Sequence, residues 1–212
     1  MNKQEEKTKR TYSKILYAAI EEFGSNTYDT ASINTICSKY HIPKGLIYHN
    51  FKNKEELYLR CVEVCFQTMR EYFEKADPPS EDVQKSLKGL LRRRENFFRQ
   101  NPYYRHIFFQ ALFQPPKQLA EKIRELRKSL DEFHQQYYQG LLKHLNLRDG
   151  ITEQTAMKYF LNYQEMFNLF FQYQASENKT FPELIQIHES QLFEILDIML
   201  YGVAKQTESV SA

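Results

Sequence analysis

Apolar side chains recur at intervals of three and four residues along most of this 212-residue chain, and this spacing constrains the fold more than any other feature. Such spacing places apolar groups on one face of an α-helix. Runs of β-branched residues that alternate with polar ones are missing, and only 6 Gly and 7 Pro interrupt the chain. The sequence therefore predicts an all-α protein built from long helices.

Capping residues, prolines and polar loops divide the chain into about nine helices. Gly24 is expected to end the first helix, Ser32 to cap the second and Ser80 to cap the fifth. Asn53 and Glu56 resemble a capping box at the start of the fourth helix, with Asn in place of Ser or Thr. The expected helices span residues 8–24, 33–40, 43–49, 53–76, 81–100, 102–114, 117–145, 152–175 and 183–205.

The composition excludes several classes of protein. With 42% hydrophobic and 15% aromatic residues, the chain is too rich in core-forming side chains to be disordered. It has no run of about 18 uncharged apolar residues, so we expect no membrane span. The first ten residues, MNKQEEKTKR, are too polar for a secretion signal. We therefore expect a cytoplasmic protein.

The three cysteines, Cys37, Cys61 and Cys65, stand among apolar residues and are expected to be reduced thiols of the core. Cys61 and Cys65 are one helical turn apart, which would suit a metal ion, but no His or acidic residue nearby completes a set of four ligands. We also find no nucleophile–base pair and no phosphate-binding loop. The sequence thus predicts no metal, no other cofactor and no enzyme activity.

Positive charge is concentrated towards the N-terminus. Residues 1–54 hold nine Lys or Arg against five Asp or Glu, although the net charge of the whole chain is only +2. A basic region on a near-neutral protein favours contact with a polyanion. The arm KQEEKTKR could touch DNA through Lys7, Lys9 and Arg10, but its two glutamates dilute the charge. We therefore expect the arm to be a solvated, disordered tail.

Residues 33–49 have the lengths of a helix-turn-helix, with two short helices separated by a turn at 40–42. Because short helical pairs are also common packing units, the chemistry of the second helix matters. Pro43 suits its first turn, where no N–H is needed, and Lys44 can reach a phosphate or a guanine edge. Gly45 costs about 1 kcal/mol relative to Ala, which is an odd choice for a purely structural helix. These features favour a helix that enters the DNA major groove.

Further polar groups adjoin this helix. Tyr48 and His49 lie one turn beyond Lys44 and can donate to phosphates. Lys54 begins the next helix, whose own N-terminus favours phosphate. The apolar residues of this region are expected in the core: Ile33, Ile36, Cys37, Ile42, Ile47 and Phe51.

The stretch from Phe23 to Tyr58 resembles the N-terminal DNA-binding domain of the TetR family of bacterial transcriptional regulators. The likeness rests on the Tyr before the second helix, Ser-Ile at its start, Lys-Gly at the start of the third helix, Tyr-His-x-Phe at its end and Asn-Lys-Glu-x-Leu at the start of the fourth. The resemblance extends over residues 8–58, about a quarter of the chain.

The resemblance implies a role for each matching position. Positions that contact phosphates are matched by Ser32, Tyr48, His49 and Lys54, and those that face base edges by Pro43, Lys44, Gly45 and Leu46. It also implies a homodimer that binds a palindromic operator, usually represses, and lets go when a small molecule enters the C-terminal domain. We accordingly assign residues 1–54 to a DNA-binding domain and residues 55–212 to a ligand-binding and dimerisation domain, connected by the helix at 53–76.

Three features depart from the family's pattern. Tyr40-His41 stands where the turn usually has Ala-Gly, and His41 is expected in the left-handed conformation that glycine adopts without cost. Leu46 replaces a frequent Thr or Ser, which leaves apolar contact, for instance with a thymine methyl group. Asn50 replaces a common aromatic residue. These departures weaken any inference about the operator sequence.

The rest of the chain is rich in aromatic side chains, which either fill the core of a helical bundle or line an apolar ligand pocket. We expect the pocket to be lined by Phe109, Phe113, Tyr137, Tyr163 and Phe167, with Asn162 or Glu165 as polar groups. A buried Glu165 would suit a cationic ligand, whereas a surface salt bridge would explain this residue equally well.

The last two helices, 152–175 and 183–205, are expected to mediate dimerisation. The first carries aromatic residues around most of its circumference. The second has a long apolar stripe, made of Leu184, Ile185, His188, Leu192, Ile195, Leu196, Met199 and Val203. Two helices from each of two subunits would form a four-helix bundle with two-fold symmetry. The alternative is that both helices pack only within the subunit.

The sequence thus predicts a ligand-responsive transcriptional regulator, by preference a repressor. It is expected to bind a pseudo-palindromic operator as a homodimer through the helix at 43–49 and to be released by a small apolar or aromatic effector. Two alternatives are an all-α enzyme, which no motif supports, and a helical interaction module whose basic end touches an acidic protein or a membrane. The operator, the effector, the regulated genes and the choice between repression and activation do not follow from the sequence.

Overall fold

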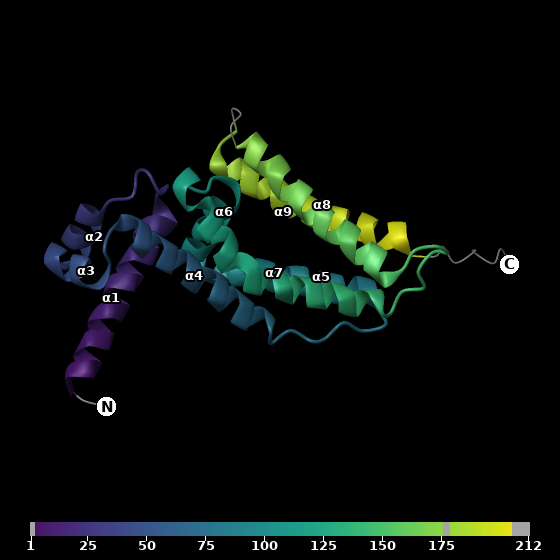
Figure 1. Ribbon diagram of the computed structural model, residues 1–212, viewed down its shortest axis with the longest axis horizontal. Helices are drawn as coiled ribbons and strands as arrows, with labels where there is room; N and C mark the ends of the chain where they lie inside the picture. The colour runs from purple at the N-terminus through teal and green to yellow at the C-terminus, as the bar shows by residue number, and fades with distance from the viewer. Residues whose placement is uncertain (1–2, 176–178, 205–212) are drawn as a thin grey trace. The chain divides into compact units, whose positions relative to one another are not determined.

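The computed structural model describes residues 3–175 and 179–204, which form nine α-helices (Figure 1). The helices are α1 (Lys3–Ser25), α2 (Ile33–Tyr40), α3 (Lys44–Asn50), α4 (Lys54–Phe73), α5 (Val83–Gln100), α6 (Pro102–Phe113), α7 (Ala120–Leu142), α8 (Glu153–Gln174) and α9 (Phe181–Val203). A short 3-10 helix, Lys117–Leu119, precedes α7. The prediction of an all-α chain with about nine helices is confirmed.

Some expectations fall on residues that the structure does not describe. These are residue 205 at the end of the expected last helix and residues 177–178 of the loop before it. Within the described residues, no helix is both long and apolar enough to cross a membrane.

Helix boundaries follow local capping chemistry, with shifts of a few residues. α3 begins one residue later than expected because Pro43, with φ −57° and ψ 132°, is its N-cap. α5 begins two residues later than expected because Asp82 Oδ1 accepts a hydrogen bond from Lys85 N at 2.9 Å. Asp82 therefore occupies the capping role that we assigned to Ser80, and that assignment was wrong.

The turn between α3 and α4 is closed by Asn53 and Glu56. As predicted, Asn53 caps α4, and its Oδ1 accepts a hydrogen bond from Glu56 N at 2.8 Å. Glu56 Oε2 in turn accepts from Lys52 N at 2.6 Å and not from Asn53 N. The reciprocal bond thus reaches one residue further back than in a standard capping box, and it fixes the backbone that follows α3.

α1 differs most from its expectation. Residues 3–10 are helical, so the prediction of a disordered tail is wrong. The side chains of residues 5–10 are exposed to solvent, as expected. The helix also continues past Gly24. A Cβ atom added to Gly24 would lie 2.5 Å from Cβ of Tyr103 in α6. Glycine is therefore required here by the close approach of α6, and it does not stop the helix as we expected.

The chain groups into two compact units. The first unit contains Met1–Met69 and Phe97–Lys128, and the second unit contains Arg70–Asn96 and Ser129–Ala212. The boundaries fall inside α4, α5 and α7, so each of these helices contributes residues to both units. The expected division at residue 54 is a division by function, and it stays a prediction.

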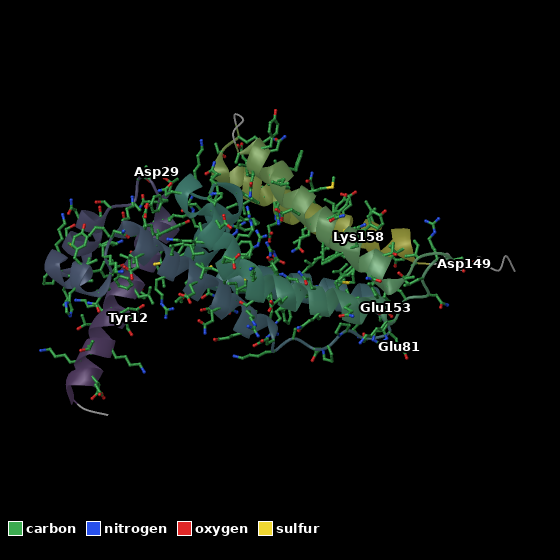
Figure 2. All side chains as sticks on the ribbon, in the orientation of Figure 1. Tyr12, Asp29, Glu81, Asp149, Glu153 and Lys158 are labelled. Carbon is green, nitrogen blue, oxygen red and sulfur yellow. The ribbon has the colours of Figure 1, made fainter. Side chains whose placement is uncertain are left out.

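Aromatic contacts form much of the core of the first unit. Tyr58 of α4 is fully buried, and its ring centroid lies 5.0 Å from that of Phe23 and 4.9 Å from that of Tyr28. Tyr12 of α1, labelled in Figure 2, stacks on Phe51 at the end of α3 with a centroid distance of 5.2 Å. These contacts hold the short helices against α1 and α4.

The core of the second unit lies among α5, α7, α8 and α9. Its buried members are Leu87, Tyr137, Tyr138, Leu141, Leu142, Ala156, Phe160 and Leu200. α8 and α9 lie side by side and run in opposite directions (Figure 1). This arrangement turns one face of each helix towards the core and leaves another face exposed.

Candidate DNA-binding surface and ligand cavity

Ser32 caps α2 and is held by α1. Its Oγ accepts a hydrogen bond from Asn34 N at 3.2 Å, and its own backbone N–H donates to Oε1 of the buried Glu22 at 2.9 Å. The hydroxyl oxygen thus acts as an acceptor inside the protein, which leaves the hydroxyl proton to be donated outward. The predicted cap is confirmed, and the predicted phosphate contact is compatible with this geometry.

The turn between α2 and α3 depends on the unusual backbone of His41. This residue has φ 50° and ψ 49°, the left-handed conformation that we predicted. The following N–H, of Ile42, donates to Cys37 O at 3.0 Å, which closes the end of α2. Two side chains at that end, Lys39 and Tyr40, donate to the carboxylate of Glu21 on α1. The turn is therefore fixed without the glycine that the family usually has.

α3 presents most of its predicted DNA-contacting residues on one exposed surface. Ile47 is buried, and so are Ile42 before the helix and Phe51 after it. The exposed residues are Pro43, Lys44, Gly45, Leu46, Tyr48 and His49, and we call them the α3 surface. Three buried anchors thus fix a helix whose remaining side chains face solvent.

Two residues of α3 show how that surface is shaped. No atom lies within 4 Å of a Cβ atom added to Gly45, so the protein itself does not require glycine at this position. Asn50, which replaces a common aromatic residue, donates from Nδ2 to Leu46 O at 2.8 Å. Its side chain therefore folds back on the helix and does not extend the α3 surface.

Lys54 is held in place by the loop before α2. Its Nζ lies 4.6 Å from the ring centroid of Tyr28 and donates to Asp29 O at 3.4 Å. Figure 2 labels Asp29 in this loop. The lysine is half-buried, so its ammonium group is positioned and yet accessible to a phosphate.

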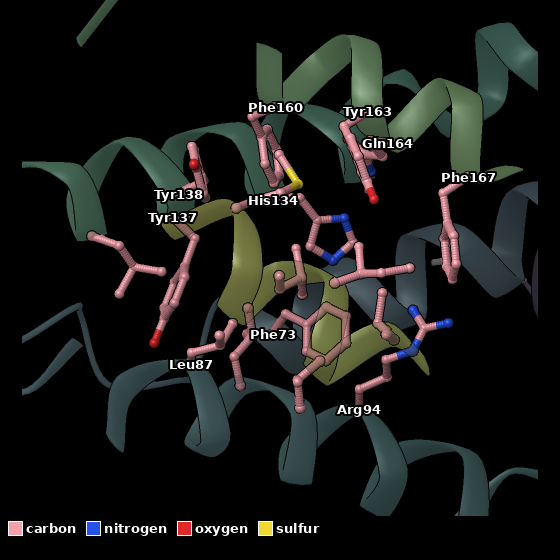
Figure 3. A pocket seen from close by; sticks show the side chains of 17 residues that line it. Phe73, Leu87, Arg94, His134, Tyr137, Tyr138, Phe160, Tyr163, Gln164 and Phe167 are labelled. Carbon is pink, nitrogen blue, oxygen red and sulfur yellow. The ribbon is translucent and has the colours of Figure 1, made fainter. Parts of the chain in front are cut away.

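A separate cavity of about 110 Å³ lies within the second unit (Figure 3). Eleven of its 17 lining residues are Leu, Ile, Met or Phe. The polar groups are supplied by Arg94, His134, Tyr137, Tyr138, Tyr163 and Gln164. A mainly apolar wall with a few polar groups is typical of a site for a small organic molecule.

The charge of Arg94 is neutralised at the cavity wall. Its Nη2 lies 3.0 Å from Glu189 Oε1, and its Nε donates to both carboxylate oxygens at 3.2 and 3.3 Å. His188 Nδ1 lies 3.1 Å from Glu189 Oε1. Burial raises the pKa of Glu189, but Arg94 and His188 outweigh it and bring the pKa to about 2. The carboxylate is therefore ionised at neutral pH, and the pair carries no net charge.

The predicted ligand-binding residues fall in three different places. Tyr137, Tyr163 and Phe167 line the cavity. Phe109 and Phe113 are buried in the first unit, where their ring centroids lie 5.2 Å apart, and they do not line it. Asn162 and Glu165 are exposed on α8 and do not line it either.

The structure adds cavity residues that the sequence reasoning missed. Neither Arg94 nor His134 was predicted to line the cavity, although Arg94 follows Leu87, Leu90 and Leu91 at helical spacing. The apolar stripe of α9, which we expected at a dimer interface, faces inward. Its buried members are Leu184, Ile185 and His188, and its cavity-lining members are Leu192, Ile195, Leu196 and Met199.

Two sequence profiles match the chain. The profile of the bacterial regulatory proteins of the tetR family matches residues 15–61. A profile of the tetracyclin repressor-like C-terminal domain matches residues 81–205, which is more than half of the chain. The two segments contain the α3 surface and most of the cavity.

Two curated relatives match about a quarter of the chain each. The Transposon Tn10 TetC protein of Escherichia coli is 38% identical over 60 residues, which cover 28% of this chain and 30% of that protein. IcaR of Staphylococcus epidermidis, described as a negative transcriptional regulator of the biofilm operon icaADBC, is 38% identical over 53 residues, which cover 25% of this chain and 29% of IcaR. The chain thus spans less than a third of the length of the curated relatives it matches.

Solved structures show that the similarity in fold extends over nearly the whole chain. A TetR family regulator from Chloroflexus aurantiacus is 20% identical, with a TM-score of 0.58 over 93% of this chain and 95% of that one. FadR from Bacillus subtilis, solved in complex with stearoyl-CoA, is 17% identical, with a TM-score of 0.54 over 91% and 99%. The two matched profiles, over residues 15–61 and 81–205, show that the chain belongs to the TetR family of bacterial regulatory proteins.

Proposed function

We propose that the protein is a repressor that binds a pseudo-palindromic operator as a homodimer and is released by a small apolar or aromatic molecule in the cavity. The observation that carries this proposal is the α3 surface, in which Lys44 and Gly45 are exposed while Ile42 and Ile47 are buried. A helix held in this way can place side chains in a major groove without disturbing its own packing. IcaR is a negative regulator, which supports repression here.

A second copy of the chain is the proposed partner of α8 and α9. Five exposed side chains, at 36% exposure or more, follow one another along α8: Tyr159, Tyr163, Met166, Phe170 and Tyr173. Their spacing of three and four residues makes one continuous apolar stripe, and Ile198 and Tyr201 of α9 are exposed as well. Two such helix pairs would bury these side chains in a symmetric four-helix bundle. We call these seven residues the α8–α9 face.

The proposal is tested by selecting operators from randomised duplex DNA and then replacing Lys44. We expect enrichment of a sequence with two-fold symmetry, because a dimer presents two copies of α3. Lys44→Ala should lower the affinity for that sequence about 10- to 100-fold. It should also reduce the slope of the logarithm of the affinity against the logarithm of the salt concentration by about two, one for each subunit's lost phosphate contact. Fluorescence anisotropy at several salt concentrations measures both effects.

The control for this variant is Lys143→Ala, which removes an exposed lysine from the second unit. We expect its operator affinity to match that of the wild type within a factor of two, because salt screens an exposed charge that does not contact the DNA. A flat selection profile, or equal losses in the two variants, would contradict the proposed function.

Gly45→Ala should separate stability from DNA binding. Because nothing lies within 4 Å of the added methyl group, the variant should gain about 1 kcal/mol of folding free energy from the higher helix propensity of alanine. The same methyl group would lie against the duplex, so we expect operator affinity to fall by about tenfold, the effect of one lost close contact. Thermal unfolding and anisotropy titrations check the two effects.

Gly89→Ala is a matched control, since this glycine is also exposed within a helix and has no atom within 4 Å of an added Cβ. It should gain similar stability and bind the operator as the wild type does. If Gly45→Ala also left binding unchanged, the α3 surface would not approach DNA at this residue.

A further inference from the structure

We propose that the first turns of α1 form a second DNA-contacting surface, at which Lys7, Arg10 and Lys14 bind phosphates of the duplex beside the base pairs that α3 reads. We call these three residues the α1 basic face. The inference rests on the proposed function in taking double-stranded DNA as the partner, and it goes beyond that function by adding a contact outside the helix-turn-helix. The added contact strengthens binding to any duplex, because phosphates carry no sequence information.

The three cations of the α1 basic face share one side of a continuous helix. Residues 3–10 belong to the same helix as the packed residues that follow them, and they extend beyond α2 and α3 (Figure 1). Lys7, Arg10 and Lys14 are exposed and stand three and four residues apart, a spacing that places side chains on one face. Lys9 is exposed too, but it stands two residues after Lys7 and so points to another face.

Packing does not account for the side chains of this segment. The fully buried residues of α1 begin at Ile15, whereas the side chains of residues 5–10 are exposed. None of the three cations forms an ion pair with a described residue. Of the two glutamates that dilute the charge of the arm, Glu5 lies on another face and Glu6 borders the α1 basic face beside Arg10. Three cations thus stand against one bordering acid.

The α1 basic face leads to the turn from which α3 starts. Tyr17, three residues after Lys14, is 61% exposed, and its ring meets that of Tyr40 edge-on with centroids 6.2 Å apart. Tyr40 ends α2 and also donates to the carboxylate of Glu21 on α1. α3 begins at Lys44, four residues after Tyr40. The α1 basic face and the exposed start of α3 therefore adjoin the same turn, and a duplex held by α3 has its backbone close to both.

The α1 basic face is long enough to contact several phosphates. Lys7 and Lys14 are seven residues apart, which is about 10 Å along a helix that rises roughly 1.5 Å per residue. Duplex DNA carries one negative charge per about 1.7 Å of its axis, so this length of duplex offers roughly six phosphates. Because the helix already fixes the spacing of the three cations, binding costs less ordering entropy than it would for a disordered tail.

The experiment measures binding of the full chain to the selected operator and to a random duplex of the same length. Lys7→Ala/Arg10→Ala/Lys14→Ala should lower the affinity for both duplexes by the same factor, about 100-fold at moderate salt. The slope of the logarithm of the affinity against the logarithm of the salt concentration should fall by about five, because a dimer loses six phosphate contacts. The ratio of the two affinities should stay within about a factor of two of the wild-type value.

The matched control is Lys9→Ala/Lys85→Ala/Lys143→Ala, which removes three exposed cations that lie off the α1 basic face. It changes the net charge by the same amount, so it corrects for long-range attraction to the duplex. We expect it to bind both duplexes within about a factor of two of the wild type, because salt screens charges that do not contact the DNA. Circular dichroism should show the same helix content in both triple variants, since every replaced side chain is exposed.

Thr8→Pro tests whether the helix itself matters, because it leaves the charge unchanged. A proline at this position removes a backbone hydrogen bond and clashes with the preceding turn, so the helix should begin near residue 8 and Lys7 should leave the α1 basic face. We expect the affinity for both duplexes to fall about fivefold, as in Lys7→Ala, the share of one phosphate contact per subunit. Thr8→Ala should bind as the wild type does.

The inference is overturned if the two triple variants bind both duplexes equally well. It is also overturned if Thr8→Pro binds as Thr8→Ala does while the α1 triple variant binds weakly, because the cations would then act from a flexible tail. A selected operator together with equal triple variants means that this inference fails alone. A flat selection profile means that the proposed function fails, and the random duplex still reports whether the α1 basic face contacts DNA.

Discussion

Glutamates in place of Met166 and Phe170 are expected to convert the proposed dimer to a monomer and to lower operator affinity at least about 100-fold, because a monomer loses the gain of engaging two half-sites together. Both side chains are exposed on α8, at 65% and 49%, so the substitutions should not disturb the subunit's own core. Across a two-fold axis each glutamate would meet its own copy or a neighbouring one. The introduced charges would thus replace apolar burial with repulsion and desolvation.

Light scattering and anisotropy titrations on Met166→Glu/Phe170→Glu test the expectation directly. Its control is Gln136→Glu/Gln139→Glu, which adds the same charge at exposed positions of α7. That control should remain dimeric and bind the operator normally. A wild-type chain that is monomeric at micromolar concentrations, or a double glutamate variant that stays dimeric, would contradict the role of the α8–α9 face.

The helix-turn-helix could be predicted from the sequence because its determinants are local. The cap at Ser32, the left-handed residue at His41 and the start of α3 next to Pro43 each depend on backbone chemistry within a few residues. The apolar anchors of that region are likewise set by spacing along one short segment. The one large local error concerns residues 3–10, where a continuous helix forms despite a charged and polar composition.

The cavity could not be predicted in the same way, because it depends on which helix faces meet. The stripe of α9 has the spacing of an interface, and nothing in that spacing distinguishes a partner subunit from α5 and α7 of the same chain. Arg94 and Glu189 are 95 residues apart in the sequence, so their pairing has no local signal. Phe109 and Phe113 resemble pocket residues by composition alone, and they pack in the other unit.

Removing Glu189 should destabilise the protein by about 3 kcal/mol, the lower end of the range for breaking a buried ion pair. The side chain of Arg94 is only 9% exposed and that of Glu189 24% exposed. In Glu189→Ala the guanidinium group loses the carboxylate that both its Nε and Nη2 bond, and His188 loses its contact as well. Urea unfolding of the wild type and the variant measures the difference.

The double variant Arg94→Met/Glu189→Leu distinguishes two contributions to stability: the cost of burying a charge that has lost its partner, and the net stabilisation by the ion pair itself. Well-packed apolar residues can replace a buried ion pair at little cost, so we expect it to recover most of the stability that Glu189→Ala loses. An equally unstable double variant would mean that the pair itself holds α5 to α9.

The response to acid follows from the lowered pKa of Glu189. Because that pKa is about 2 in the folded protein and about 4.5 when unfolded, the unfolded chain takes up a proton first as the pH falls. The stabilisation from Glu189 is therefore complete above about pH 4.5 and is lost as the pH falls towards 2. Between pH 5 and pH 3 the wild type should lose more stability than Arg94→Met/Glu189→Leu, which lacks this carboxylate. Parallel slopes in the two proteins would show that folding does not lower the pKa of Glu189 and that the ion pair contributes nothing to acid sensitivity.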